Sequence, residues 1–202
     1  MSYNTWIHKI SRVMVKPLAN TPVTPNQLTT GRLIFGLTAA GCFTVGEFGL
    51  NMAGAVCFLI SMLLDRADGE LARMTGKTSR FGAIYDLVTD AICNVALFIG
   101  IGIACMDSQL GIWAFIMGLI AGICISIILY VVVQLATEVN ADAAAMQSFA
   151  GFDPDDAIAI VPIGVVLGFG KIILILAAIC TPIVAIFITR DMIQRRRQAT
   201  SA

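Results

Sequence analysis

Long apolar stretches separated by short polar breaks dominate the hydropathy pattern of this chain. Six such stretches lie at 26–48, 50–73, 81–106, 110–137, 155–169 and 171–190. A helix needs about 20 residues to cross the hydrocarbon core of a bilayer, so the fifth stretch is short for a span. The pattern predicts an all-α integral membrane protein with six transmembrane helices.

The residues before the first stretch follow a different pattern, because 4–18 are too charged to span a membrane. Their apolar and basic side chains recur at helical spacing on separate stripes, Trp6, Ile10, Val13 and Met14 on one and Lys9, Arg12 and Lys16 on the other. This favours an N-terminal amphipathic helix lying in the interface, and the alternative is a disordered basic tail. Thr24-Pro25 then fits an N-cap followed by proline at the first helical position.

Three segments follow from this pattern. Residues 1–24 form the interfacial helix and a joint, 25–192 the six-helix domain, and 193–202 a basic cytosolic tail. With an even number of spans both termini share one side, and every Lys and Arg except Lys171 falls on that side. Basic residues favour the cytosolic side, so we expect both termini in the cytosol.

Composition agrees with this class. The chain is 58% hydrophobic and 13% charged, with a mean hydropathy of +0.88, whereas soluble domains carry about 25% charged residues. The net charge is zero, so bulk charge does not identify a partner. Small residues recur four apart at Gly36/Ala40, Gly118/Gly122 and Gly164/Gly168. They permit close helix packing, either within the monomer or in a dimer.

Four aspartates interrupt the second and third stretches. Asp65 and Asp68 stand at i and i+3 near the end of the second, and Asp86 and Asp90 at i and i+4 within the third. A short loop would make the two helices antiparallel neighbours, so that all four carboxylates converge on one cleft. Ordinary interfacial salt bridges explain the mixed-charge loop, but they do not explain acids so far inside the third stretch.

Clustered carboxylates repel one another unless cations neutralise them. Mg²⁺ prefers oxygen ligands and commonly shares them with substrate phosphates, and two such ions can clamp a displacement at phosphorus. Gly69 and Gly82 leave space where a ligand approaches the backbone, and Arg73 offers a planar fork for phosphate. The residues therefore favour a nucleotide diphosphate with metal as the class of substrate.

The run Asp65-x2-Asp68-Gly69-x2-Ala72-Arg73-x8-Gly82-x3-Asp86-x3-Asp90 resembles the signature of the CDP-alcohol phosphotransferases at all eight fixed positions. The "PNQLT" box at 25–29, the length and the six-helix plan are also similar to that family. The motif resemblance covers residues 25–95, and outside this range only the length and the helical plan are similar.

The resemblance implies a transfer in which an alcohol hydroxyl attacks the β-phosphorus of a CDP-alcohol and CMP leaves. It also implies a role in phospholipid biosynthesis and a homodimer in a bacterial cytoplasmic membrane, where the distribution of basic residues predicts an active site on the cytosolic side. Asp65, Asp68, Asp86 and Asp90 would hold two divalent cations, Mg²⁺ or Mn²⁺, with Asp90 as general base. The CDP pocket would be formed by Gly69, Ala72, Arg73 and Gly82, with Asn26 and Ser79 as further candidates.

The acceptor is predicted from charge. Relatives that use a phosphorylated acceptor commonly carry Lys or Arg after the last aspartate, where this chain has Ala91. The segment 138–156 holds five acids and no Lys or Arg, so it would repel an anionic acceptor. We expect a neutral or cationic head group, with Asp153, Asp155 and Asp156 contacting it; these three alternatively belong to a solvated loop and helix start.

Two other classes compete. An ion- or proton-coupled transporter would also use intramembrane acids, but it predicts acids near the midplane and often inverted repeats. Intramembrane prenyltransferases use two separated aspartate-rich motifs on longer chains, whereas this chain has one set.

Overall fold

The computed structural model of the chain describes residues 15–18, 21–138 and 158–201. Its helices are α2 (Pro25–Phe43), α3 (Phe48–Thr75), α4 (Arg80–Ala104), α5 (Ile112–Glu138), α8 (Ile160–Val166) and α9 (Gly170–Ser201). No strand occurs in these ranges, which agrees with the predicted all-α class. The predicted N-terminal helix and the acidic segment after α5 lie almost wholly outside the described residues.

Four helices are long and apolar enough to cross a membrane, namely Phe48–Thr75, Arg80–Ala104, Ile112–Gln134 and Gly170–Gln194. The first predicted span, α2, does not reach that hydropathy, since Asn26, Thr29 and Arg32 lie within it. The fifth is represented by α8, which has seven described residues. Six spans therefore remain a prediction.

Local sequence determines where α2 begins, where α3 ends and where α4 begins. The Thr24 amide donates to Gln27 Oε1 at 3.0 Å ahead of Pro25, which confirms the predicted N-cap. Helix α3 ends at Gly76, whose φ of 67° is left-handed, a conformation that glycine adopts without steric cost. The Ser79 hydroxyl then accepts from the Gly82 amide at 3.0 Å and caps α4.

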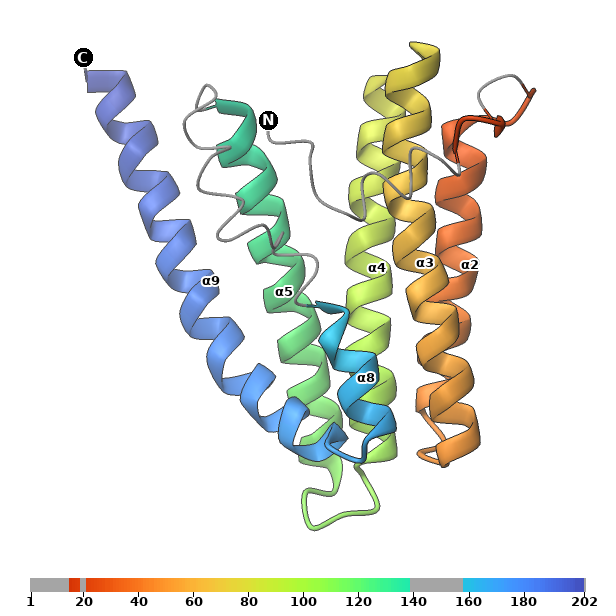
Figure 1. Ribbon diagram of the computed structural model, residues 1–202. Helices are drawn as coiled ribbons and strands as arrows, with labels where there is room; N and C mark the ends of the chain where they lie inside the picture. The colour runs from red at the N-terminus through yellow and green to blue at the C-terminus, as the bar shows by residue number, and fades with distance from the viewer. Residues whose placement is uncertain (1–14, 19–20, 139–157, 202) are drawn as a thin grey trace.

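The short turn after α3 makes α3 and α4 antiparallel, but α2 is the helix that joins them. Helix α2 packs extensively against both, whereas α3 and α4 have little direct backbone packing over their described lengths. The predicted antiparallel arrangement therefore holds, with α2 supplying the main backbone contact to each of the two helices at the site. Helix α5 packs on α4, α9 packs on α5, and α8 lies against α3 and α9 (Figure 1).

Small residues allow the close helix contacts. A Cβ on Gly122 would lie 2.7 Å from the Val95 Cα, and one on Gly118 would collide with the Phe98 carbonyl. A Cβ on Gly36 would press on Cys93 and Ser61. These glycines therefore allow close helix packing within the chain, which is the first of the two predicted alternatives.

Gly168 does not belong to that set. It has a φ of +86° and open space around its Cα, and it lies in the turn between α8 and α9. Its place in the Gly164/Gly168 pair therefore reflects the turn that follows α8, and not helix packing.

The start of α2, the turn between α3 and α4 and the end of α9 lie at one end of the bundle (Figure 1). This arrangement agrees with the predicted sharing of one side by the basic segments. Helix α9 has 32 residues and continues through 193–201, the segment predicted as a tail. At 1.5 Å per residue it extends about 48 Å, more than the roughly 30 Å hydrocarbon core.

Candidate active site

Helix α2 brings a polar face to the site. Asn26, Thr29 and Arg32 follow one another at three-residue spacing, so they share one side of the helix. Thr29 is 3% exposed and Arg32 is 4% exposed. Buried polar groups need partners, and both find them on the neighbouring helices.

Helix α3 contributes the first two aspartates near its last turns. Asp68 is buried, and its Oδ2 accepts a hydrogen bond from the Thr29 hydroxyl at 2.6 Å. Asp65, one turn earlier, has a side chain that is about a quarter exposed. The Thr29 bond therefore fixes the position of the Asp68 carboxylate.

Helix α4 contributes the remaining two aspartates from its second and third turns. Asp86 and Asp90 are half-buried and lie on the face directed at α2 and α3, since both reach the Arg32 guanidinium. The side-chain oxygens of Asp65, Asp68 and Asp86 all lie within 4.8 Å of one another. Three carboxylates at this spacing, from two helices, fit the oxygen donor set that a hard divalent cation takes. The site can therefore hold a metal ion.

The Arg32 guanidinium lies among these carboxylates. Its Nη1 is 2.5 Å from Asp65 Oδ1 and 2.7 Å from Asp86 Oδ1, and its Nη2 pairs with Asp90 Oδ1. The Arg32 carbonyl accepts from the Ser61 hydroxyl at 3.0 Å, which ties this turn of α2 to α3. One buried cation thus links α2, α3 and α4.

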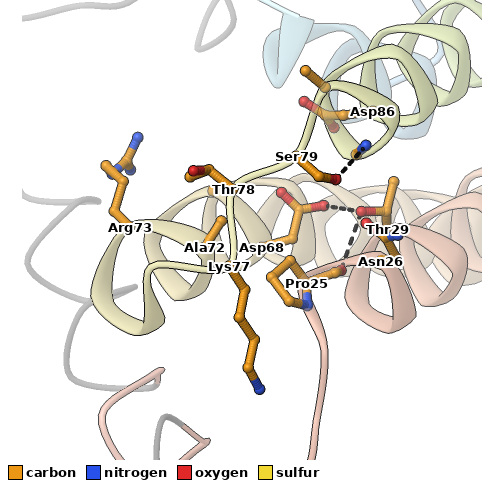
Figure 2. A pocket seen from close by; sticks show the side chains of 13 residues that line it. Pro25, Asn26, Thr29, Asp68, Ala72, Arg73, Lys77, Thr78, Ser79 and Asp86 are labelled. Atoms are coloured by element: carbon orange, nitrogen blue, oxygen red, sulfur yellow. Dashed lines mark hydrogen bonds between the residues drawn. The ribbon is translucent and has the colours of Figure 1, made fainter.

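A cavity of about 240 Å³ opens beside Asp68 and Asp86 (Figure 2). Its wall includes all six residues predicted to bind CDP, namely Asn26, Gly69, Ala72, Arg73, Ser79 and Gly82. Pro25, Thr29, Lys77, Thr78 and Ala83 complete it. The structure brings the predicted set together around one opening, and their binding roles remain proposals.

Two predicted residues of the wall have additional local roles. Ser79 caps α4, and a Cβ on Gly82 would lie 3.1 Å from Ser79 Oγ and 3.2 Å from Asn26 Oδ1. Glycine at this position therefore keeps the space between the starts of α2 and α4 open.

Arg73 lies at the rim and extends away from Asp68 (Figure 2). Its Nη2 donates to Glu70 Oε2 at 2.9 Å, and its Nε to the same oxygen at 3.3 Å. Glu70 is 4% exposed. Glu70 is not among the predicted site residues, but its buried carboxylate anchors the arginine that we expect to meet phosphate.

Asp90 occupies a different position from the other three. It is outside the group whose oxygens lie within 4.8 Å, and it lines a second cavity of about 30 Å³ together with Arg32, Asp65 and Asn94. Its predicted roles as ligand and base remain proposals. The predicted acceptor contacts Asp153, Asp155 and Asp156 lie outside the described residues.

Sequence reasoning missed the roles of Thr29 and Arg32. Arg32 was used only as a marker of the cytosolic side. An arginine in the second turn of an apolar helix is costly unless it is paired, and its three-residue spacing from Thr29 places both on one face. These two signals identify α2 as the third wall of the site.

Comparison with known protein families shows which family the chain belongs to. The model of the family described as CDP-alcohol phosphatidyltransferase matches residues 22–193, which includes every described helix except the end of α9. The chain belongs to the CDP-alcohol phosphatidyltransferase family. The predicted resemblance is therefore confirmed, and with the four apolar helices it identifies an integral membrane protein.

Named relatives in this family match part of the chain. An archaetidylinositol phosphate synthase of Pyrococcus horikoshii is 33% identical over 88 residues, 44% of this chain and 45% of the relative. A phosphatidylinositol phosphate synthase of Mycobacterium tuberculosis is 35% identical over 95 residues, 46% of this chain and 42% of the relative. A bifunctional IPC transferase and DIPP synthase of Rubrobacter xylanophilus is 33% identical over 86 residues, 43% of this chain and 19% of the relative. The matched segment thus spans less than half of each relative.

The bond between Thr29 and Asp68 gives a test of the metal site. Replacing Thr29 by Val keeps the side-chain shape but removes the 2.6 Å hydrogen bond. We expect Mn²⁺ affinity to fall by about 10- to 100-fold, because a partner that orients a metal ligand contributes this much. Mn²⁺ binding is measured by electron paramagnetic resonance of the free ion in detergent.

The control is Thr38→Val on the same helix, since Thr38 is exposed and donates only to the Ile34 carbonyl among the bonds of α2. Equal Mn²⁺ affinities for the two variants would show that Asp68 does not depend on Thr29 to hold a metal.

Proposed function

We propose that this protein transfers a phosphoalcohol group from a CDP-alcohol to an acceptor hydroxyl and releases CMP, in phospholipid biosynthesis. The observation that carries the proposal is the gathering of the Asp65, Asp68 and Asp86 carboxylate oxygens within 4.8 Å of one another, with Asp68 and Asp86 in the wall of the cavity. Family membership over 22–193 supports the class of reaction.

The residues around the cavity have different proposed roles in binding the donor. Gly69, Ala72 and Gly82 leave room for the nucleotide next to the helix backbones, and Asn26 and Ser79 offer polar atoms at its edge. Arg73 and Lys77 place positive charge at the rim, where a diphosphate would approach. Divalent cations bound by the aspartates would neutralise the diphosphate and stabilise the charge that develops on its oxygens.

The transfer breaks the phosphoanhydride bond of the CDP-alcohol and forms a phosphoester bond to the acceptor. The acceptor oxygen forms a bond to the β-phosphorus, the bond from that phosphorus to the oxygen of CMP breaks, and the hydroxyl proton passes to a base. Asp90 is the proposed base, because it lies one helical turn beyond Asp86 and outside the wall of the nucleotide cavity. A carboxylate there can take the proton without displacing the donor.

We propose a neutral or cationic acceptor or head group, such as a polyol, serine, ethanolamine or choline. The chain has no Lys or Arg between Arg80 and Lys171, so α5, α8 and the part of α4 that follows Arg80 offer no cation to an acceptor phosphate. The acidic segment 138–156 adds negative charge to the same stretch. Asp153, Asp155 and Asp156 are proposed to contact the head group.

The relatives favour a second candidate. Two of them are named as synthases of inositol phosphate lipids, which suggests an inositol phosphate acceptor. In this chain the phosphate would then have to be met by basic residues at the end of the bundle that carries Arg73, Lys77 and Arg190. The two candidates differ in whether the acceptor bears a phosphate.

A panel of donors and acceptors separates them. The protein, purified in detergent with Mg²⁺, is given CDP-diacylglycerol with serine, inositol, inositol phosphate or glycerol 3-phosphate, and CDP-choline or CDP-ethanolamine with diacylglycerol. We expect CMP release with an unphosphorylated acceptor and at least tenfold less with the two phosphorylated ones, because like charges repel. Robust activity with glycerol 3-phosphate or inositol phosphate would overturn the acceptor proposal, and no CMP release with any pair would overturn the transferase.

The panel also separates the enzyme from an ion- or proton-coupled transporter, which would not release CMP. Asp65 and Asp68 lie in the second half of α3 and Asp86 and Asp90 in the first half of α4, which is toward the α3–α4 turn, whereas transporter sites typically lie near the bilayer midplane. We further propose a homodimer in a bacterial cytoplasmic membrane, with six spans and the site facing the cytosol.

A further inference from the structure

Arg32 lies among the aspartates of the candidate metal site. Its side chain is 5% exposed, and it pairs with Asp65, Asp86 and Asp90. Two of these partners, Asp65 and Asp86, also belong to the group that can hold a metal ion. The guanidinium and a metal ion would therefore share the same carboxylates.

The position of Arg32 is fixed by the backbone around it. Ser61 on α3 donates to its carbonyl at 3.0 Å. One turn later, Gly36 lets α2 lie close to Cys93 on α4 and to Ser61. A guanidinium held by a helix packed on both partners loses little freedom when it pairs, unlike an arginine on a mobile surface.

The Arg32 guanidinium offsets the repulsion among the carboxylates when no metal is bound. Four carboxylates in one site carry four negative charges, and like charges at this spacing strongly disfavour ionisation. Arg32 places one positive charge against three of them, and Thr29 holds the fourth, Asp68, by a hydrogen bond. These contacts thus stabilise the four carboxylates in the metal-free protein.

We propose that Arg32 is a positioning residue that acts as an internal counter-cation of the metal site. It holds Asp65, Asp86 and Asp90 together in the metal-free protein, and it lowers the affinity for divalent cations by competing for Asp65 and Asp86. The inference rests on the proposed metal site, but it does not depend on which alcohol is transferred.

Thermal unfolding tests the first half of this inference. Arg32→Met keeps the length of the side chain and removes its charge, so we expect its Tm in EDTA to fall several degrees below that of the wild type. Saturating Mg²⁺ supplies the missing charge and should remove most of that difference. The metal-induced rise in Tm is therefore expected to be larger for the variant than for the wild type.

Mn²⁺ binding tests the second half. Arg32→Met should bind Mn²⁺ about tenfold or more tightly than the wild type, since a nearby positive charge no longer opposes the ion. Arg80→Met is the matched control, because Arg80 is exposed at the start of α4. It removes the same charge at the same end of the bundle and should change neither measurement.

The outcomes separate the possible failures. An equal loss of Tm with and without Mg²⁺, together with unchanged or weaker Mn²⁺ binding, would mean that Arg32 only packs the helices, and it would overturn the inference alone. Absence of Mn²⁺ binding by both proteins would overturn the metal site and the inference with it, while CMP release in the panel is read separately.

Arg32→Lys keeps the test decisive where Arg32→Met does not fold. One ammonium cannot contact three carboxylates in the way a planar guanidinium does. We expect this variant to show the same changes at smaller size, with Mn²⁺ binding a few-fold tighter than the wild type. Binding equal to that of the wild type would overturn the inference.

Discussion

Asp90→Asn is expected to abolish CMP release while CDP-alcohol binding survives. Asn keeps the shape of the side chain but has no carboxylate to accept the hydroxyl proton, and losing a general base slows turnover by about 100- to 10,000-fold. Binding should persist because the nucleotide cavity is lined by Asp68 and Asp86 and does not include Asp90.

Two measurements on the same preparation check this result. CMP release is followed with the best substrate pair of the panel, and donor binding is followed by the shift in Tm that the CDP-alcohol produces with Mg²⁺. Asp107→Asn is the control, since Asp107 is exposed in the loop after α4, at the opposite end of the bundle. Near-normal CMP release by Asp90→Asn would remove Asp90 from the role of base.

Gly82→Leu should have the complementary effect, with donor binding lost and metal binding retained. A Cβ at this position already approaches Ser79 and Asn26 within 3.1–3.2 Å, and the rest of a leucine would extend into the space between α2 and α4. We expect the concentration of CDP-alcohol needed for half-maximal CMP release to rise by about 100-fold or more, since a nucleotide cannot share that volume.

Mn²⁺ binding and donor saturation are measured side by side for this variant. Gly41→Leu on α2 serves as the control, because a Cβ there has nothing within 4 Å and the position is exposed. Unchanged donor saturation in Gly82→Leu would exclude this cavity as the CDP site. Loss of Mn²⁺ binding as well would mean that the substitution disturbs Asp86, one turn further along α4.

The variants at Asp90, Gly82, Thr29 and Arg32 address separate parts of one mechanism. Asp90→Asn tests proton transfer, Gly82→Leu tests the nucleotide cavity, and the Thr29 and Arg32 variants test how the carboxylates are held. Metal binding, donor binding and turnover can therefore fail independently, so each proposed role can be rejected without rejecting the others.

The transmembrane pattern was readable from the sequence where helices are uniformly apolar. Helices α3, α4 and α5 begin and end within a few residues of the predicted stretches, and α9 begins where predicted but continues past 190 to Ser201. Hydropathy over about 20 residues reports the lipid environment directly. It is less informative for α2 and α8. Helix α2 carries polar side chains into the bundle, and α8 has too few described residues to be judged by length.

Helical periodicity gives the relative placement of the aspartates and glycines without a structure, because residues three and four apart lie on one face. This was enough to predict that Asp65, Asp68, Asp86 and Asp90 converge, although the group within 4.8 Å contains only the first three. The closing of the site by α2 follows only from how the helices pack. Periodicity describes one helix at a time, whereas the pairing of Arg32 with three aspartates and of Thr29 with Asp68 depends on how α2 packs between α3 and α4.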